Sequence, residues 1–537
     1  MKKTTRLSCL FLACGMITTG TAIAQKRPNV IVIMADDLGF ADLGCYGSEI
    51  PTPHLDALAK NGVRLTNFYN TARCCPSRAS LLTGIYAHQA GIGHMMEDKG
   101  PEHPAYRGRL NNESVTIGEV MKNAGYFTAM VGKWHVGQAQ GVVPWKRGFD
   151  RSLNAPAGGF YYGDHPNAKL FLNGKRLPND AAVLPQNWYS TDLWSNYSLR
   201  FIDEALQEQK PFMLYLAYNA PHFPLQAPLD EIEKFRKKYL EGWEKLREQR
   251  YKKQLAIGLL DPSSKLTPFN PNVPDWDQLS QQEKEKFDHI MAIYAAVIAH
   301  MDKSIGDLVA GLKKRNVFDN TVLLFVSDNG GNAEPGAEGK YDGAIPGSSQ
   351  SSVFLGQGWA EASCTPFWGY KHQTHEGGIS SPCIVSWPAG IPASRNGAFE
   401  RQPAHITDIM ATLVDLGKTQ YPSTFGGNAI QPLEGASMVP AFTGKKINRV
   451  NPIFWEHEGN KAVLDGKWKL VAEHTEQWQL YDIENDRSEL HDLSSAQPEI
   501  AGKLKREYEH WYQKVKAEPF KRTFKWFYNY TDAKSNL

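Results

Sequence analysis

The stretch NVIVIMADD, residues 29–37, decides the fold of this 537-residue chain. Its first seven residues are apolar or β-branched, apart from the opening asparagine, and they lie between Pro28 and Asp36. This pattern predicts a strand that is buried on both faces, as in a parallel sheet covered by helices. Asp36 and Asp37 follow at the carboxyl end of the strand, which is the edge where open α/β sheets bind ligands.

Three further segments have the same buried-strand character, at residues 126–133, 211–218 and 321–327. Between the last two, apolar residues at helical spacing predict a long helix over residues 283–314. A shorter helix opens at Thr52-Pro53 and stops at Gly62. Strands that alternate with helices indicate an α/β fold with a large, mainly parallel sheet flanked by helices.

The character of the chain changes after residue 420. Short strand candidates occur at residues 453–457, 469–473 and 479–483, and an amphipathic helix is predicted over 498–516. We therefore expect a large α/β domain over residues 25–420. A smaller C-terminal α+β subdomain with an antiparallel sheet is expected over 421–537.

Residues 1–24 have the pattern of a signal peptide. A basic start with Lys2 and Lys3 precedes an apolar run over residues 7–17, and Ala22-Ile23-Ala24 fits a cleavage site. The run is too short to span a bilayer, and no later segment is apolar enough to do so. We expect export to the periplasm, with secretion or lipid anchoring at Cys14 as the alternatives.

Cleavage there would change the formal net charge from +2 to −1, because three basic residues and no acidic ones are removed. A near-neutral protein gives no support for nucleic-acid binding. Five cysteines would remain: Cys45, Cys74, Cys75, Cys364 and Cys383. An odd number in an oxidising compartment indicates that one thiol is unpaired or has another use.

Acidic residues follow two of the predicted strands. Asp36 and Asp37 follow the first, and Asp328 and Asn329 follow the strand at 321–327. Three carboxylates and one amide oxygen form a hard ligand set that suits Ca²⁺ or Mg²⁺ better than Zn²⁺. A single aspartate pair after a strand is more often a turn or a helix cap, but two such strand ends strengthen the prediction of a metal site.

The segment CCPSRASLLTG, residues 74–84, carries the clearest chemical signal. Pro76 is suited to the first turn of a helix that runs to Gly84. The free amides at the start of that helix would favour an anion beside Cys74, and Arg78 adds a cation. The ordinary interpretation of a lone cysteine is a small buried apolar residue.

Cys-x-Pro-Ser-Arg followed by Leu-Leu-Thr-Gly resembles the signature of the type I sulfatases, and the chain looks like their arylsulfatase branch. Residues 125–135, GYFTAMVGKWH, match the second signature of that family. Shorter matches occur in family order at 35–37, 220–222, 327–330, 371 and 376–378, so the resemblance spans residues 28–390. It implies an alkaline-phosphatase-like sandwich fold and hydrolysis of sulfate esters.

In that family the cysteine is oxidised to formylglycine (3-oxoalanine) by a formylglycine-generating or maturase enzyme before export. The resemblance implies that Cys74 is this residue and that its hydrated aldehyde attacks sulfur. It also implies one bound Ca²⁺, with Mg²⁺ less favoured, held by Asp36, Asp37, Asp328, Asn329 and modified residue 74.

The resemblance assigns roles to the basic residues as well. Arg78 and Lys133 would orient the diol, and His135 would take the proton from its second hydroxyl. Lys133 and His135 are two residues apart at a strand end, so we expect them on one face. His222 and Lys371 would act on the leaving-group side.

The substrate is expected to be a small aryl sulfate or a sulfated carbohydrate. Two other functions stay open: a phosphonate or phosphate monoester or diester hydrolase of the same superfamily, and a non-catalytic protein that binds sulfated glycans. Candidate residues at the cleft rim, each as consistent with ordinary loop structure, are Tyr161, Tyr162, Asp164, His165, Trp359 and His375.

Overall fold

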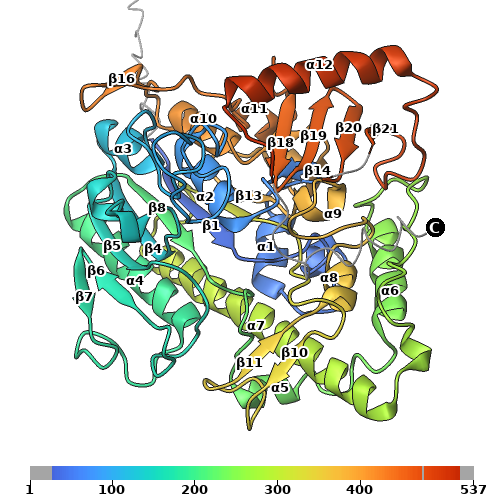
Figure 1. Ribbon diagram of the computed structural model, residues 1–537. Coiled ribbons are helices and arrows are strands. Elements are labelled where there is room, and N and C mark those ends of the chain that lie inside the picture. The colour runs from blue at the N-terminus through green and yellow to red at the C-terminus, as the bar shows by residue number, and fades with distance from the viewer. Residues whose placement is uncertain (1–26, 475–476, 521–537) are drawn as a thin grey trace, which may run out of the picture.

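The computed structural model describes residues 27–474 and 477–520, and a ten-stranded sheet forms its centre (Figure 1). In spatial order the strands are β14 (Ala398–Glu400), β2 (Val63–Leu65), β13 (Ile384–Ser386), β9 (Thr321–Ser327), β1 (Asn29–Ala35), β8 (Phe212–Ala217), β4 (Phe127–Lys133), β5 (Arg151–Ala155), β6 (Leu170–Leu172) and β7 (Lys175–Leu177). From β9 to β5 every neighbouring pair is parallel, whereas antiparallel pairs occur toward both edges. The expected parallel centre is confirmed, within a sheet that is mixed overall.

The register of the central strands explains why the two acidic strand ends meet. Ala35 of β1 is paired with Ser327 of β9, so the residues that follow them leave the sheet at the same level. On the other side of β1, Met34 is paired with Ala217 of β8. Asp36 and Asp328 are therefore brought together by strand pairing across nearly three hundred residues of chain.

Alternate residues of β1 enter two different cores, as expected for a strand buried on both faces. Ile31 and Ile33 belong to the core that contains α1 (Pro53–Lys60), α4 (Ser190–Gln207) and α7 (Gln281–Lys314). Val30 and Val32 belong to the core on the opposite face. That second face is covered by α2 (Cys74–Thr83), α3 (Ile117–Asn123) and α10 (Asp408–Leu416). The result is a three-layer sandwich of helices, sheet and helices.

The predicted C-terminal antiparallel sheet is present and has four strands. In order they are β18 (Ile453–His457), β19 (Asn460–Asp465), β20 (Trp468–Ala472) and β21 (Gln479–Asp482). Helix α12 (Pro498–Lys514) lies along this sheet in Figure 1 and packs on it through Leu504, Tyr508 and Trp511. The sequence did not indicate β19, because Glu458-Gly459 is not one of the usual hairpin-turn pairs. The domain boundary after residue 420 stays a prediction.

Shorter elements complete the described chain. The remaining helices are α5 (Leu229–Glu233), α6 (Trp243–Ala256), α8 (Gln357–Ser363), α9 (Glu376–Ile379) and α11 (Val439–Phe442). The small sheets contain β3 (Phe68–Tyr69), β12 (Ser380–Ser381), β15 (Ala404–His405), β10 (Lys340–Asp342), β11 (Ser352–Phe354), β16 (Thr424–Phe425) and β17 (Asn428–Ala429). Among residues 27–474 and 477–520, no helix is both long enough and apolar enough to cross a membrane. The predicted signal peptide lies outside the described residues.

Candidate active site

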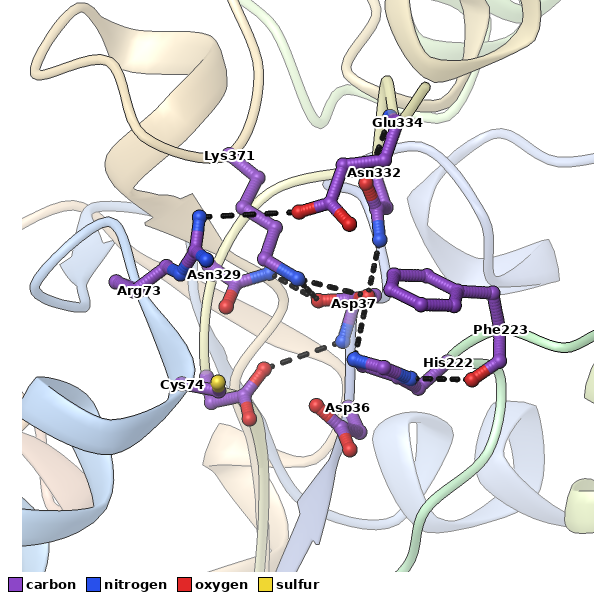
Figure 2. A network of polar contacts seen from close by, with 12 residues as sticks. Asp36, Asp37, Arg73, Cys74, His222, Phe223, Asn329, Asn332, Glu334 and Lys371 are labelled. Atoms are coloured by element: carbon purple, nitrogen blue, oxygen red, sulfur yellow. Dashed lines mark hydrogen bonds and ion pairs between the residues drawn. The ribbon is translucent and has the colours of Figure 1, made fainter. Parts of the chain in front are cut away.

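The two acidic strand ends form one buried cluster at the carboxyl edge of the parallel strands (Figure 2). The backbone amide of Asp37 donates a hydrogen bond of 3.1 Å to Oδ1 of Asp328. Nδ2 of Asn329 donates one of 2.7 Å to Oδ1 of Asp37. Asp36, Asp37, Asp328 and Asn329 are each at most 1% exposed. These are the four protein residues for which the sequence predicted a shared metal site.

The oxygen atoms of this cluster suit a hard divalent cation. Oδ1 of Asp36 and Oδ1 of Asn329 are buried and have no hydrogen-bond partner among the described residues. A buried oxygen without a partner costs about 1–3 kcal/mol, so native proteins rarely leave one unused. Carboxylate and amide oxygens are the ligands that Ca²⁺ and Mg²⁺ prefer. The donor set therefore fits the ion that the sequence predicted.

Cys74 is the first residue of α2 and lies beside this cluster, and its side chain is 2% exposed. Ser77, one turn into the helix, fastens the helix start because its hydroxyl donates a hydrogen bond of 2.5 Å to the carbonyl of Asp328. The Cys75 thiol, together with Lys133 and His135, holds the pKa of Cys74 well below its usual range. The helix ends at Gly84 as predicted, with a left-handed φ of 74°.

Arg78 and Lys133 neutralise the acidic cluster from the side of Cys74. Nη2 of Arg78 lies 2.7 Å from Oδ2 of Asp328 and 3.5 Å from Oδ1 of Asp36. Nζ of Lys133 lies 2.6 Å from Oδ2 of Asp36. Burial raises the pKa of Asp36, but Lys133, His222 and Arg78 outweigh it and hold that pKa below its usual range. Asp36 is therefore a carboxylate that remains ionised although it is buried.

His135 also reaches Cys74, with Nδ1 3.7 Å from Sγ. The expected reason, alternation along one strand, does not apply because β4 ends at Lys133. His135 instead has a left-handed φ of 56°, and its amide donates to the carbonyl of Pro156. Burial and the charge of Lys133 lower the pKa of His135. The imidazole is therefore held neutral and able to accept a proton.

His222 and Lys371 both lie against the carboxylate of Asp37, and Figure 2 shows them on different sides of it. Nε2 of His222 lies 3.6 Å from Oδ2 of Asp37, and Nζ of Lys371 lies 2.8 Å from Oδ1. The Tyr161 hydroxyl donates a hydrogen bond to the carbonyl of His222, which holds the loop that carries His222 in place. The structure thus brings all the sequence-predicted catalytic and metal residues into one site.

The loop after β9 contributes two residues that the sequence analysis missed. Nδ2 of Asn332 donates a hydrogen bond of 2.7 Å to Oδ2 of Asp37. Glu334 has a pKa of about 2, because Lys371, His372 and Arg73 outweigh the effect of burial. Their position three and five residues after Asn329, in the same loop, was the signal that could have identified them.

Several of the candidate rim residues do not lie at a rim. Trp359 is 1% exposed and packs edge-on against Trp243, with ring centroids 5.5 Å apart. Tyr161 and His375 are buried as well. Trp359 and Tyr161 belong to the hydrophobic core beneath the sheet, a role that the sequence could not distinguish from one at a cleft. Tyr162 and His165 are half-buried and Asp164 is exposed.

Two protein-family models match the chain. The model described as Sulfatase matches residues 28–419. The model described as N-sulphoglucosamine sulphohydrolase, C-terminal, matches residues 367–514. The first match contains every residue of the site described above.

Individual relatives agree with these matches. An uncharacterized sulfatase of Schizosaccharomyces pombe is 33% identical over 525 residues, covering 89% of this chain and 92% of that protein. An arylsulfatase of Klebsiella aerogenes is 33% identical over 447 residues, covering 79% of this chain and 95% of that protein. The crystal structure of Ps i-CgsB in complex with k-i-k-neocarrahexaose has a TM-score of 0.66 at 28% identity and covers 90% of this chain and 93% of that one.

Proposed function

This chain belongs to the sulfatase family and is a sulfuric ester hydrolase, and we propose that its nucleophile is a formylglycine made from Cys74. The observation that carries this proposal is the position of Cys74 at the start of α2. Its Sγ lies beside His135, Arg78 of the same helix pairs with Asp328, and Lys133 at the end of β4 pairs with Asp36. Residue 74 is therefore surrounded by cationic and hydrogen-bonding side chains, which stabilise the negative charge of a sulfate ester.

Ca²⁺ is the cation we assign to the oxygen cluster, held by Asp36, Asp37, Asp328 and Asn329 together with residue 74. A hydrated formylglycine supplies a hydroxyl nucleophile with a second hydroxyl on the same carbon, and a divalent cation beside it lowers the pKa of that nucleophile and neutralises sulfate charge. The Sγ of Cys74 marks where the diol oxygens would lie.

The chain's own residues orient and deprotonate this group. Ion pairs with Asp36 and Asp328 hold Lys133 and Arg78 beside residue 74. These two cations therefore need no reorganisation during the reaction, and no free energy is lost in orienting them. His135 accepts the proton of the second hydroxyl at Nδ1, which lies 3.7 Å from Sγ. Loss of that proton expels sulfate and restores the aldehyde.

His222 and Lys371 serve the leaving group. Nδ1 of His222 lies 2.6 Å from the carbonyl of Phe223, and since a carbonyl only accepts, Nδ1 carries a hydrogen. Nε2 is then the atom that faces Asp37 and the departing ester oxygen, and from the imidazolium form, in which both ring nitrogens carry hydrogen, it delivers its proton to that oxygen. Lys371 binds a sulfate oxygen.

The substrate we propose is a small aryl sulfate or a sulfated carbohydrate. The first is supported by the likeness to an arylsulfatase, and the second by the likeness to a protein crystallised with a carrahexaose. A maturase that acts on Cys74 before export to the periplasm is part of the proposal. A desulfation screen across aryl sulfates and sulfated sugars would separate the two substrate classes.

The reaction is tested by comparing nitrophenyl sulfate, nitrophenyl phosphate and a nitrophenyl phosphonate as substrates of one preparation. We expect the largest kcat/KM for the sulfate. A larger value for the phosphonate or phosphate would assign the site to the alternative hydrolase. Elemental analysis provides the metal control: we expect one Ca²⁺ per chain in the wild type and a reduced content in Asn329→Ala.

A further inference from the structure

A second cluster of buried ligand-type side chains lies where the C-terminal sheet meets the large domain. His457 is the last residue of β18, and Glu458 begins the turn to β19. His372 comes from the loop that carries Lys371. The three residues are 1%, 7% and 7% exposed. One ligand atom from each lies within 4.8 Å of the other two.

The carboxylate of Glu458 joins these histidines and a further one. Its Oε2 lies 3.0 Å from Nδ1 of His372, and its Oε1 lies 2.9 Å from Nε2 of His94. The same Oε1 lies 3.6 Å from Nε2 of His457. The ring of His457 stacks on that of His94, with centroids 5.7 Å apart, and lies 5.8 Å from that of His372. Three imidazoles therefore surround one carboxylate.

Hydrogen bonding within the cluster does not satisfy His457. Neither ring nitrogen of His457 has a hydrogen-bond partner among residues 27–474 and 477–520. A buried polar group in that condition costs about 1–3 kcal/mol, and most native structures avoid it. Imidazole nitrogens and carboxylate oxygens are the ligand types that bind Zn²⁺, so a buried imidazole with unused nitrogens beside a carboxylate and two more imidazoles has the groups of a metal site.

We propose that His372, His457 and Glu458 bind a second divalent metal ion of the zinc type, with His94 as the fourth ligand. Nitrogen-rich sites of this kind suit Zn²⁺, whereas the all-oxygen cluster at Asp36 suits Ca²⁺. The side chain of His94 is 22% exposed, which gives the ion a way in.

The net charge around the cluster is compatible with a bound cation. The guanidinium of Arg73 contacts the ring of His372, and its Nη1 lies 3.8 Å from Oε1 of Glu334. Glu334 and Glu458 together carry two negative charges; Arg73 carries one positive charge, and Lys371, which also acts on Glu334, is paired with Asp37. A bound ion would tie the turn between β18 and β19 to the loop that follows α2, through His94, and to the loop that carries Lys371, through His372. It would act as a structural clamp beside the active site.

The test uses the full chain with Cys74→Ser. Cys74, Cys75 and His135 are themselves close enough to compete for Zn²⁺, and this substitution removes one of those ligands. The protein is saturated with Ca²⁺, loaded with Zn²⁺, dialysed and analysed for both elements. We expect one zinc per chain and a higher Tm than without zinc. Adding His457→Phe should abolish both effects.

His405→Phe in the same background is the matched control, because His405 is another imidazole that is 1% exposed but lies outside the cluster. It should retain the zinc. If His457→Phe does not fold, Glu458→Gln replaces it as the test variant, with the same expected loss of zinc. The proposal is wrong if the Cys74→Ser protein holds no zinc after dialysis, or if the cluster variants hold as much as the control. Neither result depends on hydrolysis of any ester.

Discussion

Nδ1 of His222 donates a hydrogen bond of 2.6 Å to the carbonyl of Phe223, and the two rings stack with centroids 4.2 Å apart (Figure 2). This pair keeps a hydrogen on Nδ1 and fixes the direction of the imidazole, so Nε2 is the nitrogen that gains and then delivers the second proton. Nε2 is thereby aimed at Oδ2 of Asp37, where the leaving-group oxygen is expected. The contacts of the ring with Phe223 therefore orient His222, a loop residue, so that Nε2 can donate a proton to the leaving group.

Replacing His222 by Gln should lower kcat by roughly 100- to 10,000-fold for a substrate with a poor leaving group, because the departing oxygen then needs a proton. Nitrophenyl sulfate, whose leaving group is stable as an anion, should lose much less. The comparison of kcat for an alkyl or sugar sulfate with that for nitrophenyl sulfate measures the difference. Equal losses for both substrates would exclude proton donation by His222.

Phe223→Leu keeps the backbone carbonyl but removes the stacked ring. The ring lies between His222 and Phe354, 4.2 Å and 4.0 Å away. An aromatic pair contributes about 0.5–1.5 kcal/mol, so we expect kcat to fall by up to about tenfold with little change in KM. Phe171→Leu, which removes a ring stacked on Trp145, is the control and should leave kcat unchanged. A change confined to KM would indicate a role in binding instead.

The attachment of the C-terminal sheet depends on a buried charge. Lys469 of β20 is 0% exposed and lies 2.9 Å from Oε1 of Glu376 and 2.7 Å from Oε1 of Glu489. Lys469→Met would leave Glu489 without this cation and Glu376 with Arg487 alone, and we expect a loss of about 3–5 kcal/mol in the free energy of unfolding. Lys503→Met, which breaks an exposed ion pair with Asp465, should cost less than about 1 kcal/mol. Urea unfolding measures both, and similar losses would contradict this role of Lys469.

Stability should fall at alkaline pH because of His300. Burial lowers the pKa of His300, but its hydrogen bonds to Asp192 and Glu231 outweigh burial and raise the pKa to about 9. The folded state therefore holds this proton more tightly than the unfolded state. The stabilisation is complete below a pH of about 6.5 and is lost as the pH rises through about 9.

Solvent screens the interaction of His300 with Asp192, because the side chain of Asp192 is 45% exposed, and this limits the contribution of His300 to the free energy of unfolding. We expect a loss of about 2 kcal/mol between pH 6.5 and 9.5 that is present in the wild type and absent in His300→Gln. Urea unfolding of both proteins at the two pH values gives the difference. Parallel pH dependence in the two proteins would show that His300 does not contribute.

Much of the site could be predicted from sequence because its parts follow recognisable local patterns. Asp36 and Asp328 end two strands whose apolar runs are easily identified, and neighbouring parallel strands end at one edge of a sheet. Cys74 begins a helix that carries Pro76 in its first turn. Each of these signals lies within about ten residues of chain.

Other features depend on contacts that no local pattern encodes. His94 and Glu458 are 364 positions apart and meet only because the turn between β18 and β19 packs on the large domain. His135 reaches Cys74 through one left-handed residue after β4, not through strand alternation. Tryptophan is a residue type that often contacts ligands, but Trp359 is buried in a hydrophobic core. Tertiary packing decides such cases, so the sequence alone left them open or indicated them wrongly.

The modification of Cys74 is the central claim and can be measured directly. Peptide mass spectrometry determines the fraction of chains in which the thiol sulfur is replaced by an aldehyde oxygen with loss of two hydrogens. Preparations made with and without a co-expressed maturase should span a range of that fraction. We predict that kcat for nitrophenyl sulfate rises in proportion to the modified fraction and is abolished in Cys74→Ala. Full activity in protein whose Cys74 is an intact thiol would contradict the mechanism.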